Sequence, residues 1–227
     1  MNRSLPDFAA ALVVIPVALV LFAARMSGSS RPLAEPVAAP AFDAVSASAP
    51  EDTAVFAGGC FWGIEAVFEH VKGVKSAISG YAGGNVGNPS YEQVSSGDTG
   101  HAESVQVIYN PSQVSYGKLL QIFFSVAHDP TQLNRQGPDH GTQYRSAIFY
   151  NTPQQQQVAE SYIKQLTAAK NFSRPIVTQV SKLRAFYRAE EYHQNYLEQH
   201  PNQLYIVIND KPKVAALKKE FPDIYRN

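Results

Sequence analysis

The sequence predicts an α+β protein, folded as a two-layer α/β sandwich and preceded by an N-terminal apolar helix and a flexible linker. Three observations lead to this fold class. Segments with strand-like and helix-like patterns interleave after residue 53, several neighbouring strands are spaced as in hairpins, and 44% of the residues are apolar. A chain of 227 residues with this composition can bury one core of good size, so we expect one folded domain plus an extension.

The extension begins with a membrane-targeting pattern. Residues 8–24 read FAAALVVIPVALVLFAA without a charge, between Arg3 and Arg25. A core helix is a poor interpretation, because such a run at the extreme terminus has no polar face for water. The small-residue stretches at 23–24 and 27–29 are ambiguous cleavage sites, so residues 1–25 are either a signal peptide or a membrane anchor. We expect an exported protein, periplasmic or otherwise extracytoplasmic or membrane-anchored, which meets the membrane only through this segment.

A linker and then the folded domain follow. Residues 26–52 are rich in Ala, Pro and Ser and lack periodic apolar positions, so we expect a flexible linker that buries nothing. In the domain at 53–227, residues 102–109 alternate polar and apolar side chains and residues 116–127 have a helical apolar face. The patterns predict strands at 53–58, 74–81, 102–109, 145–150 and 176–181, helices at 62–71, 116–127, 153–170 and 190–200, and a long loop at 82–99.

Charge and cysteine content exclude several classes of function. The 19 basic and 19 acidic residues cancel, so no overall positive field would attract phosphates, and we expect no nucleic-acid partner. The chain has one cysteine, Cys60, which excludes an internal disulfide, a Cys-x-x-Cys pair and a cysteine-rich zinc site. Cys60 is therefore either a small buried apolar residue or a reactive thiol.

The neighbours of Cys60 favour a reactive thiol. The stretch GGCFWG, residues 58–63, lies where a predicted strand gives way to a predicted helix. Unpaired N–H groups at a helix N-terminus stabilise a thiolate, by about 0.3–1 kcal/mol at exposed sites and ~2 kcal/mol when partly buried. That lowers a thiol pKa by roughly one unit, so full activation at neutral pH needs further help.

Four motifs carry a family resemblance. GCFWGIE, GYAGG, NPSYEQVSSGDTGHAESV and HDPTQLNRQGPDHGTQYRSAIFY resemble, in this order, the A-type peptide methionine sulfoxide reductases, over about residues 55–150 and more weakly to AEEYHQNYL. The resemblance implies a ferredoxin-like core with a mixed sheet. It also implies that the protein repairs oxidative damage by reducing methionine S-sulfoxide in proteins through a cysteine sulfenic acid, and it leaves open whether free methionine sulfoxide is a substrate too.

The same resemblance implies roles for catalytic residues. Cys60 matches the cysteine that attacks the sulfoxide sulfur, and Glu103 matches the acid that protonates the sulfoxide oxygen. His101 would share a strand face with Glu103, so either could approach the site, although a buried carboxylic acid suits the chemistry better. A thiolate and a carboxyl group so close together would raise each other's pKa and titrate as a coupled pair.

Further residues are assigned to the substrate. Tyr91 and Tyr144 match tyrosines whose hydroxyls hold the sulfoxide oxygen. Phe61 and Trp62 would form the apolar wall that receives the methyl group of the methionine sulfoxide. The candidate substrate-binding set is completed by Asp139, for which an Asx-turn is an equal alternative, and by Tyr192, with Tyr196 as a competing assignment.

Recycling requires a partner, because no second cysteine can resolve the sulfenic acid. We expect no bound cofactor or metal, and an external thiol reductant that is thioredoxin-like, glutaredoxin-like or a small molecule. Oxidised proteins or peptides bearing methionine sulfoxide are the expected substrates.

Other functions remain open on the sequence alone. A Cys-His hydrolase or acyltransferase would pair Cys60 with one of four histidines: His101, His128, His140 or His193. A non-catalytic module could bind methionine-bearing peptides in an aromatic cleft. A metal site would draw on His128, Asp129, Asp139, His140 and His193, but their spacing follows no ligand pattern.

Overall fold

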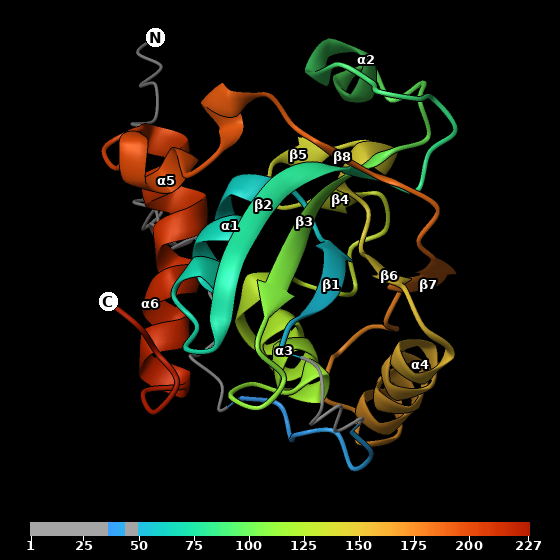
Figure 1. The fold of residues 1–227 in the computed structure, drawn as a ribbon, viewed down its shortest axis with the longest axis vertical. Coiled ribbons are helices and arrows are strands. Elements are labelled where there is room, and N and C mark those ends of the chain that lie inside the picture. The colour runs from blue at the N-terminus through green and yellow to red at the C-terminus, as the bar shows by residue number, and fades with distance from the viewer. Residues whose placement is uncertain (1–35, 44–49) are drawn as a thin grey trace, which may run out of the picture. The chain divides into compact units, whose positions relative to one another are not determined.

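The centre of the structure is a curved six-stranded sheet (Figure 1). The structure, a computed structural model, describes residues 36–43 and 50–227. The strand order is β7-β6-β1-β3-β2-β8, and only the β6–β7 pair is parallel, so the sheet is mixed. Including the separate β4–β5 hairpin, the strands are β1 (Asp52–Ala57), β2 (Val74–Ala82), β3 (Ala102–Tyr109), β4 (Arg135–Gln136), β5 (Asp139–His140), β6 (Ala147–Tyr150), β7 (Gln179–Lys182) and β8 (Phe186–Arg188).

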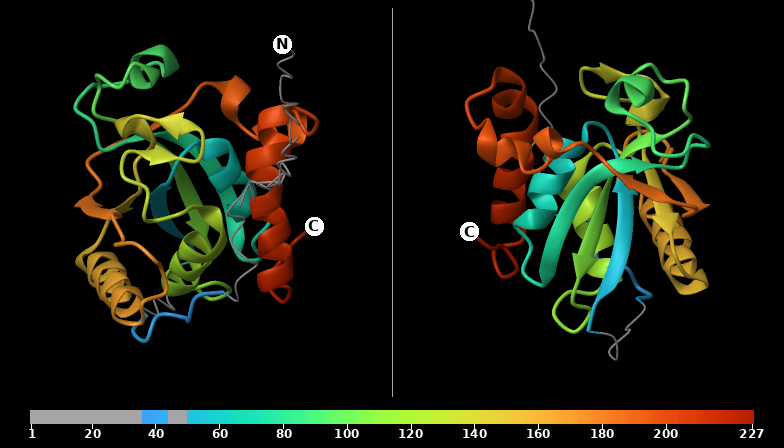
Figure 2. Two further views of the ribbon diagram at one scale, coloured as in Figure 1. Left: turned by 180° about the vertical axis from the view of Figure 1, so that it is seen from behind. Right: turned by 45° about the horizontal axis from the view of Figure 1, so that its top comes forward.

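Side chains cap the starts of some of the helices. Ser115 and Thr152 accept backbone N–H bonds at the starts of α3 and α4. The helices are α1 (Phe61–Glu69), α2 (Tyr91–Ser95), α3 (Tyr116–Ile122), α4 (Pro153–Ala168), α5 (Tyr196–Gln199) and α6 (Lys211–Glu220). A π-helical turn, Phe123–Ala127, extends α3, and a second, Ile206–Asp210, leads into α6. Helix α6 packs beside α1, as both views in Figure 2 show.

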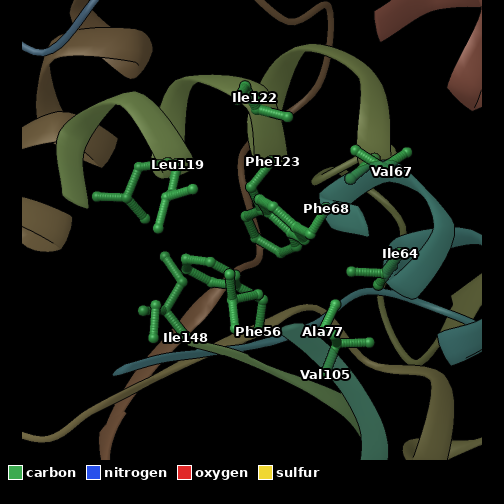
Figure 3. Close-up of a cluster of buried hydrophobic side chains, with 14 of the residues drawn as sticks. Phe56, Ile64, Val67, Phe68, Ala77, Val105, Leu119, Ile122, Phe123 and Ile148 are labelled. Carbon is green, nitrogen blue, oxygen red and sulfur yellow. The ribbon is translucent and has the colours of Figure 1, made fainter. Parts of the chain in front are cut away.

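The main core lies between the sheet and the helices α1 and α3 (Figure 3). Phe56 of β1 stacks on Phe68 of α1 and Phe123 of the π turn, with ring centroids 5.3 and 4.9 Å apart. Its neighbours Val55 and Ala57 point to the opposite face and join a smaller apolar cluster there. Fully burying one Phe is worth roughly 1.5–3 kcal/mol, so these rings anchor α1, and with it Cys60, on the sheet.

The predicted fold class agrees with this arrangement. The elements β1-α1-β2-β3-α3-β6, with strand order β6-β1-β3-β2, have the connectivity of a ferredoxin-like βαββαβ unit, and β7 makes the sheet mixed. The sheet is wider than this four-stranded core, because β7 and β8 add one strand at each edge.

Several predicted elements differ in the structure. The predicted helix at 190–200 is wrong, because Asn195 adopts a left-handed conformation (φ 51°) that separates a 3-10 turn at Glu191–His193 from α5. The strand predicted at 176–181 is displaced to β7, and the loop at 82–99 contains α2. The patterns gave no indication of β8, the β4–β5 hairpin or α6.

Part of the linker packs on the domain. Val37 is buried (3% exposed), its carbonyl accepts a bond from Gln121 Nε2 (2.7 Å), and Tyr162 donates to the Ala38 carbonyl (2.7 Å). The expectation that the linker buries nothing is therefore wrong for residues 36–43. The apolar segment at 8–24 lies outside the described residues. Among the helices that are described, none has the length and apolar character needed to cross a membrane.

Candidate active site

A sharp turn places Cys60 at the start of α1. Strand β1 ends at Ala57, and Gly59 has φ 98°, a left-handed conformation that favours glycine. A Cβ on Gly59 would also lie 2.5 Å from Gln136 side-chain carbons, so no larger residue fits. Cys60 is the N-cap residue of α1 and is 7% exposed, so it is buried at a strand-to-helix junction, where the sequence placed it.

Glu103 reaches the same helix start from β3. The Phe61 N–H donates to Glu103 Oε2 at 3.1 Å, so the carboxyl group satisfies a backbone donor that the Cys60 side chain does not cap. Burial raises the pKa of Glu103 to about 8, the Phe61 N–H bond opposes the rise, and the charges of Asp139 and Asp210 add to it. Glu103 therefore holds a proton at neutral pH, as its predicted role as an acid requires.

The Cys60 thiol is also protonated in the resting site. Burial raises the pKa of Cys60 well above its usual range, and the charges of Glu103 and Asp210 raise it further. The backbone N–H of Trp62 and the ammonium of Lys213 act in the opposite direction. The stabilisation expected from the helix N-terminus is thus present but outweighed by desolvation.

Two tyrosines border this pair. Tyr91 is the first residue of α2, which begins with a capping box at Ser90, and Tyr144 ends the 3-10 turn Thr142–Tyr144. Burial raises the pKa of both hydroxyls, and the charges of Glu103 and Cys60 contribute to both shifts. Both hydroxyls are therefore neutral donors close to the Cys60–Glu103 pair.

Asp139 is linked to a residue that the sequence analysis did not select. The Tyr205 hydroxyl donates to Asp139 Oδ2, which connects the β4–β5 hairpin to the chain before α6. Burial, then the charges of Cys60 and Asp139, raise the Tyr205 pKa, so this tyrosine also faces the site. The carboxylate of Asp139 thus has a partner on another element, which an Asx-turn alone would not provide.

The aromatic side chains divide into buried and covering groups. Phe61 is fully buried and lies 5.0 Å from the His193 ring, whereas Trp62 is partly exposed and donates from Nε1 to His193 Nδ1 (3.3 Å). Tyr196 stacks face to face on Trp62, with centroids 3.8 Å apart and planes at 6°. Tyr192 is 53% exposed, with its ring against His193. Of the two competing tyrosines, Tyr196 is the one that contacts Trp62.

The histidines have other partners. His128 bonds the Phe123 carbonyl and Ser146, and burial lowers its pKa to about 4. The His101 ring bonds the Gly84 N–H and the Val86 carbonyl, away from Glu103, and His140 is exposed on β5. Across residues 36–43 and 50–227, no three His, Cys, Asp or Glu side chains are grouped so that they could hold a metal ion.

Sequence reasoning missed the residues of the C-terminal segment, namely Tyr205, Asp210 and Lys213. Two of them, Asp210 and Lys213, act on the pKa of Cys60, and Tyr205 binds Asp139. The segment Asp210-Lys211-Pro212 was an available signal, because an acidic residue followed by proline is typical of a helix start.

Known proteins resemble this chain over most of the folded domain. The family model described as peptide methionine sulfoxide reductase matches residues 52–224. The peptide methionine sulfoxide reductase MsrA 2 of Mesorhizobium japonicum is 59% identical over 77% of this chain and 89% of its own length. Its namesake from Synechocystis sp. is 53% identical over 76% of this chain and 80% of its own.

Solved structures agree with these relatives. The crystal structure of Mxr1 from Saccharomyces cerevisiae in reduced form has a TM-score of 0.62 and 36% identity, over 68% of this chain and 88% of that one. Methionine sulfoxide reductase A of Corynebacterium diphtheriae has a TM-score of 0.58 and 39% identity, over 67% of this chain and 76% of that one. The chain therefore belongs to the peptide methionine sulfoxide reductase family, oxidoreductases that reduce methionine sulfoxide and so repair oxidative damage.

Proposed function

We propose that Cys60 is the nucleophile of this reductase and Glu103 its proton donor. The observation that carries the proposal is the bond from Phe61 N–H to Glu103 Oε2, which holds a protonated carboxyl group at the start of α1, where Cys60 is the N-cap residue. The Cys60 sulfur attacks the sulfoxide sulfur, and Glu103 protonates the oxygen. Cys60 gains that oxygen as a sulfenic acid, methionine leaves as the thioether, and the thiol proton restores Glu103.

Neighbouring side chains would bind the sulfoxide group. Tyr91 and Tyr144 carry neutral hydroxyls near Glu103, so both can donate to the sulfoxide oxygen as its charge develops. Trp62, backed by buried Phe61 and stacked on Tyr196, offers an apolar surface to the methyl group. Asp139 would contact the substrate from β5, and Tyr192 would close the rim of the site.

A defined peptide substrate tests this function. With dithiothreitol as reductant, a peptide containing methionine S-sulfoxide should be reduced, and the same peptide with the R-sulfoxide should serve as the stereochemical control. Cleavage of p-nitrophenyl esters without any added thiol would instead support a Cys-His hydrolase, for which the bonding of the histidines gives no indication. Binding without turnover would point to a methionine-peptide binding module.

Recycling should depend on an external thiol, because Cys60 is the single cysteine of the chain. Without reductant, we expect each enzyme molecule to release about one equivalent of methionine and then stop, with a sulfenic acid that a dimedone-type probe traps. Adding dithiothreitol, or a thioredoxin-like or glutaredoxin-like protein, should restore turnover. Rapid-quench counting of methionine decides the point, since release of clearly more than one equivalent would mean that another group regenerates the thiol.

The N-terminal segment should direct the protein out of the cytoplasm. From the charge-free run at residues 8–24, we expect the full chain in the membrane or extracytoplasmic fraction, and a chain lacking residues 1–25 to be soluble and active. Cell fractionation with an activity assay tests both, and N-terminal sequencing separates a cleaved signal from an anchor. Recovery of the full-length chain in the cytosol would contradict the proposal.

A further inference from the structure

A charged pair from the C-terminal segment lies against the helix that carries Cys60. Lys213 Nζ donates to Asp210 Oδ1 at 3.1 Å, across the junction between the π turn Ile206–Asp210 and α6. The Asp210 side chain is fully buried and that of Lys213 is 17% exposed. A buried ion pair costs desolvation energy that a surface pair does not, so its position requires an explanation.

The pair occupies the space of a side chain at Gly63. A Cβ built on Gly63 would lie 2.2 Å from Asp210 Oδ1 and 2.7 Å from Lys213 Nζ, closer than real Cβ contacts allow. Gly63 is the third residue of α1, and Cys60 is its N-cap. Residues three apart on a helix are neighbours, so both charges lie within about one helical turn of Cys60. The last glycine of GGCFWG therefore admits the pair.

One oxygen of the pair has no partner. Asp210 Oδ2 is buried and makes no hydrogen bond among the residues that the structure describes. A buried acceptor without a partner costs about 1–3 kcal/mol, so this oxygen adds nothing to the stability of the pair. Asp210 therefore holds Lys213 through Oδ1, and its second carboxylate oxygen has no protein partner among the described residues.

We propose that Asp210 and Lys213 are positioning residues that set the protonation state of Cys60, the carboxylate favouring the thiol and the ammonium favouring the thiolate. The inference rests on the proposed role of Cys60 as nucleophile. The carboxylate of Asp210 would keep Cys60 protonated at rest. The ammonium of Lys213 would offset negative charge on the sulfur as it attacks.

The charges of Asp210 and Lys213 shift the pKa of Cys60 in the directions that the proposal requires. Burial is the largest cause of the raised pKa of Cys60, but among the charges Asp210 raises it and Lys213 lowers it. Burial likewise raises the pKa of Asp210, and Lys213 opposes that rise. The other titratable groups that face Cys60 are Glu103 on β3, Tyr91 on α2, Tyr144 of the 3-10 turn and Tyr205 before α6, with Asp139 of β5 acting on Glu103 and Tyr205.

The test is the pH dependence of alkylation by iodoacetamide. Cys60 is the one cysteine, so the rate reports its thiolate fraction whether or not Cys60 is catalytic. Asp210→Asn should move the profile to lower pH and Lys213→Met to higher pH, each by about one unit, which is about tenfold in rate at a fixed pH below the midpoint. Opposite displacements are the signature, because loss of packing would not reverse sign between the two variants.

Matched variants separate the loss of the Lys213 charge from other effects of substitution. Lys213→Arg keeps the charge and should keep the wild-type profile, and Lys211→Met removes an exposed lysine from the same helix and should leave it unchanged. Thermal unfolding identifies variants that fail to fold, and if Asp210→Asn is one of them, the Met and Arg variants of Lys213 decide the result. Equal displacements, or none, overturn the inference. Failure of the nucleophile assignment would appear separately, as turnover by Cys60→Ser.

Discussion

Replacing Cys60 with serine should abolish sulfoxide reduction while leaving the fold intact. A serine hydroxyl is far less nucleophilic than a thiol at neutral pH, and no second cysteine in the chain could take over the attack. We expect methionine release from an S-sulfoxide peptide with dithiothreitol to fall to the rate without enzyme. This is the largest effect of any single substitution proposed for the site.

The fold should survive this change because serine is close to cysteine in size. Cys60 is 7% exposed and makes no side-chain cap bond, so exchanging sulfur for oxygen removes no capping contact. Circular dichroism and the thermal unfolding midpoint should therefore match those of the wild type. Substantial turnover by a purified, folded Cys60→Ser protein would falsify the assignment of the nucleophile.

Residues near Cys60 were predictable because local patterns place them. Val55 to Ala57 lead into the glycine turn, and the predicted strand at 102–109 has the same bounds as β3, which brings Glu103 to the start of α1. The same alternation wrongly left His101 as a candidate, because His101 precedes β3 and its ring bonds the loop at Gly84 and Val86. A period of two describes side-chain direction only inside a strand.

Long-range contacts account for what the sequence did not indicate. Tyr205, Asp210 and Lys213 reach the site only because α6 packs beside α1, and no spacing within the segment shows that contact. The break at Asn195 had only a weak local signal, because asparagine adopts the left-handed conformation more readily than most residues. A long-range contact holds that turn, in which Glu65 on α1 accepts the Asn195 backbone N–H at 3.1 Å. The protonated state of Cys60 likewise follows from burial, which depends on the whole fold.

The second large effect concerns Glu103. Glu103→Gln should lower the rate of the first step by roughly 10²–10⁴, the usual range for loss of a general acid. A glutamine carbonyl can still accept the Phe61 N–H bond, so the start of α1 should keep its geometry, but an amide cannot supply the proton that the sulfoxide oxygen needs. Single-turnover measurement of methionine release isolates this step from recycling, and peptide binding should change less.

The pH profile and a matched variant make the Glu103 result specific. Because burial raises the pKa of Glu103 to about 8, the acid is present below that pH, and the wild-type rate should fall as Glu103 ionises above it. Glu103→Gln should lose this dependence. Glu65, a second buried carboxyl group on α1, has a pKa also raised to about 8 by burial, yet it bonds Asn195 and Ser79 instead of the Cys60 turn. Glu65→Gln should therefore keep the first-step rate, and an unchanged rate in Glu103→Gln would rule Glu103 out as the proton donor.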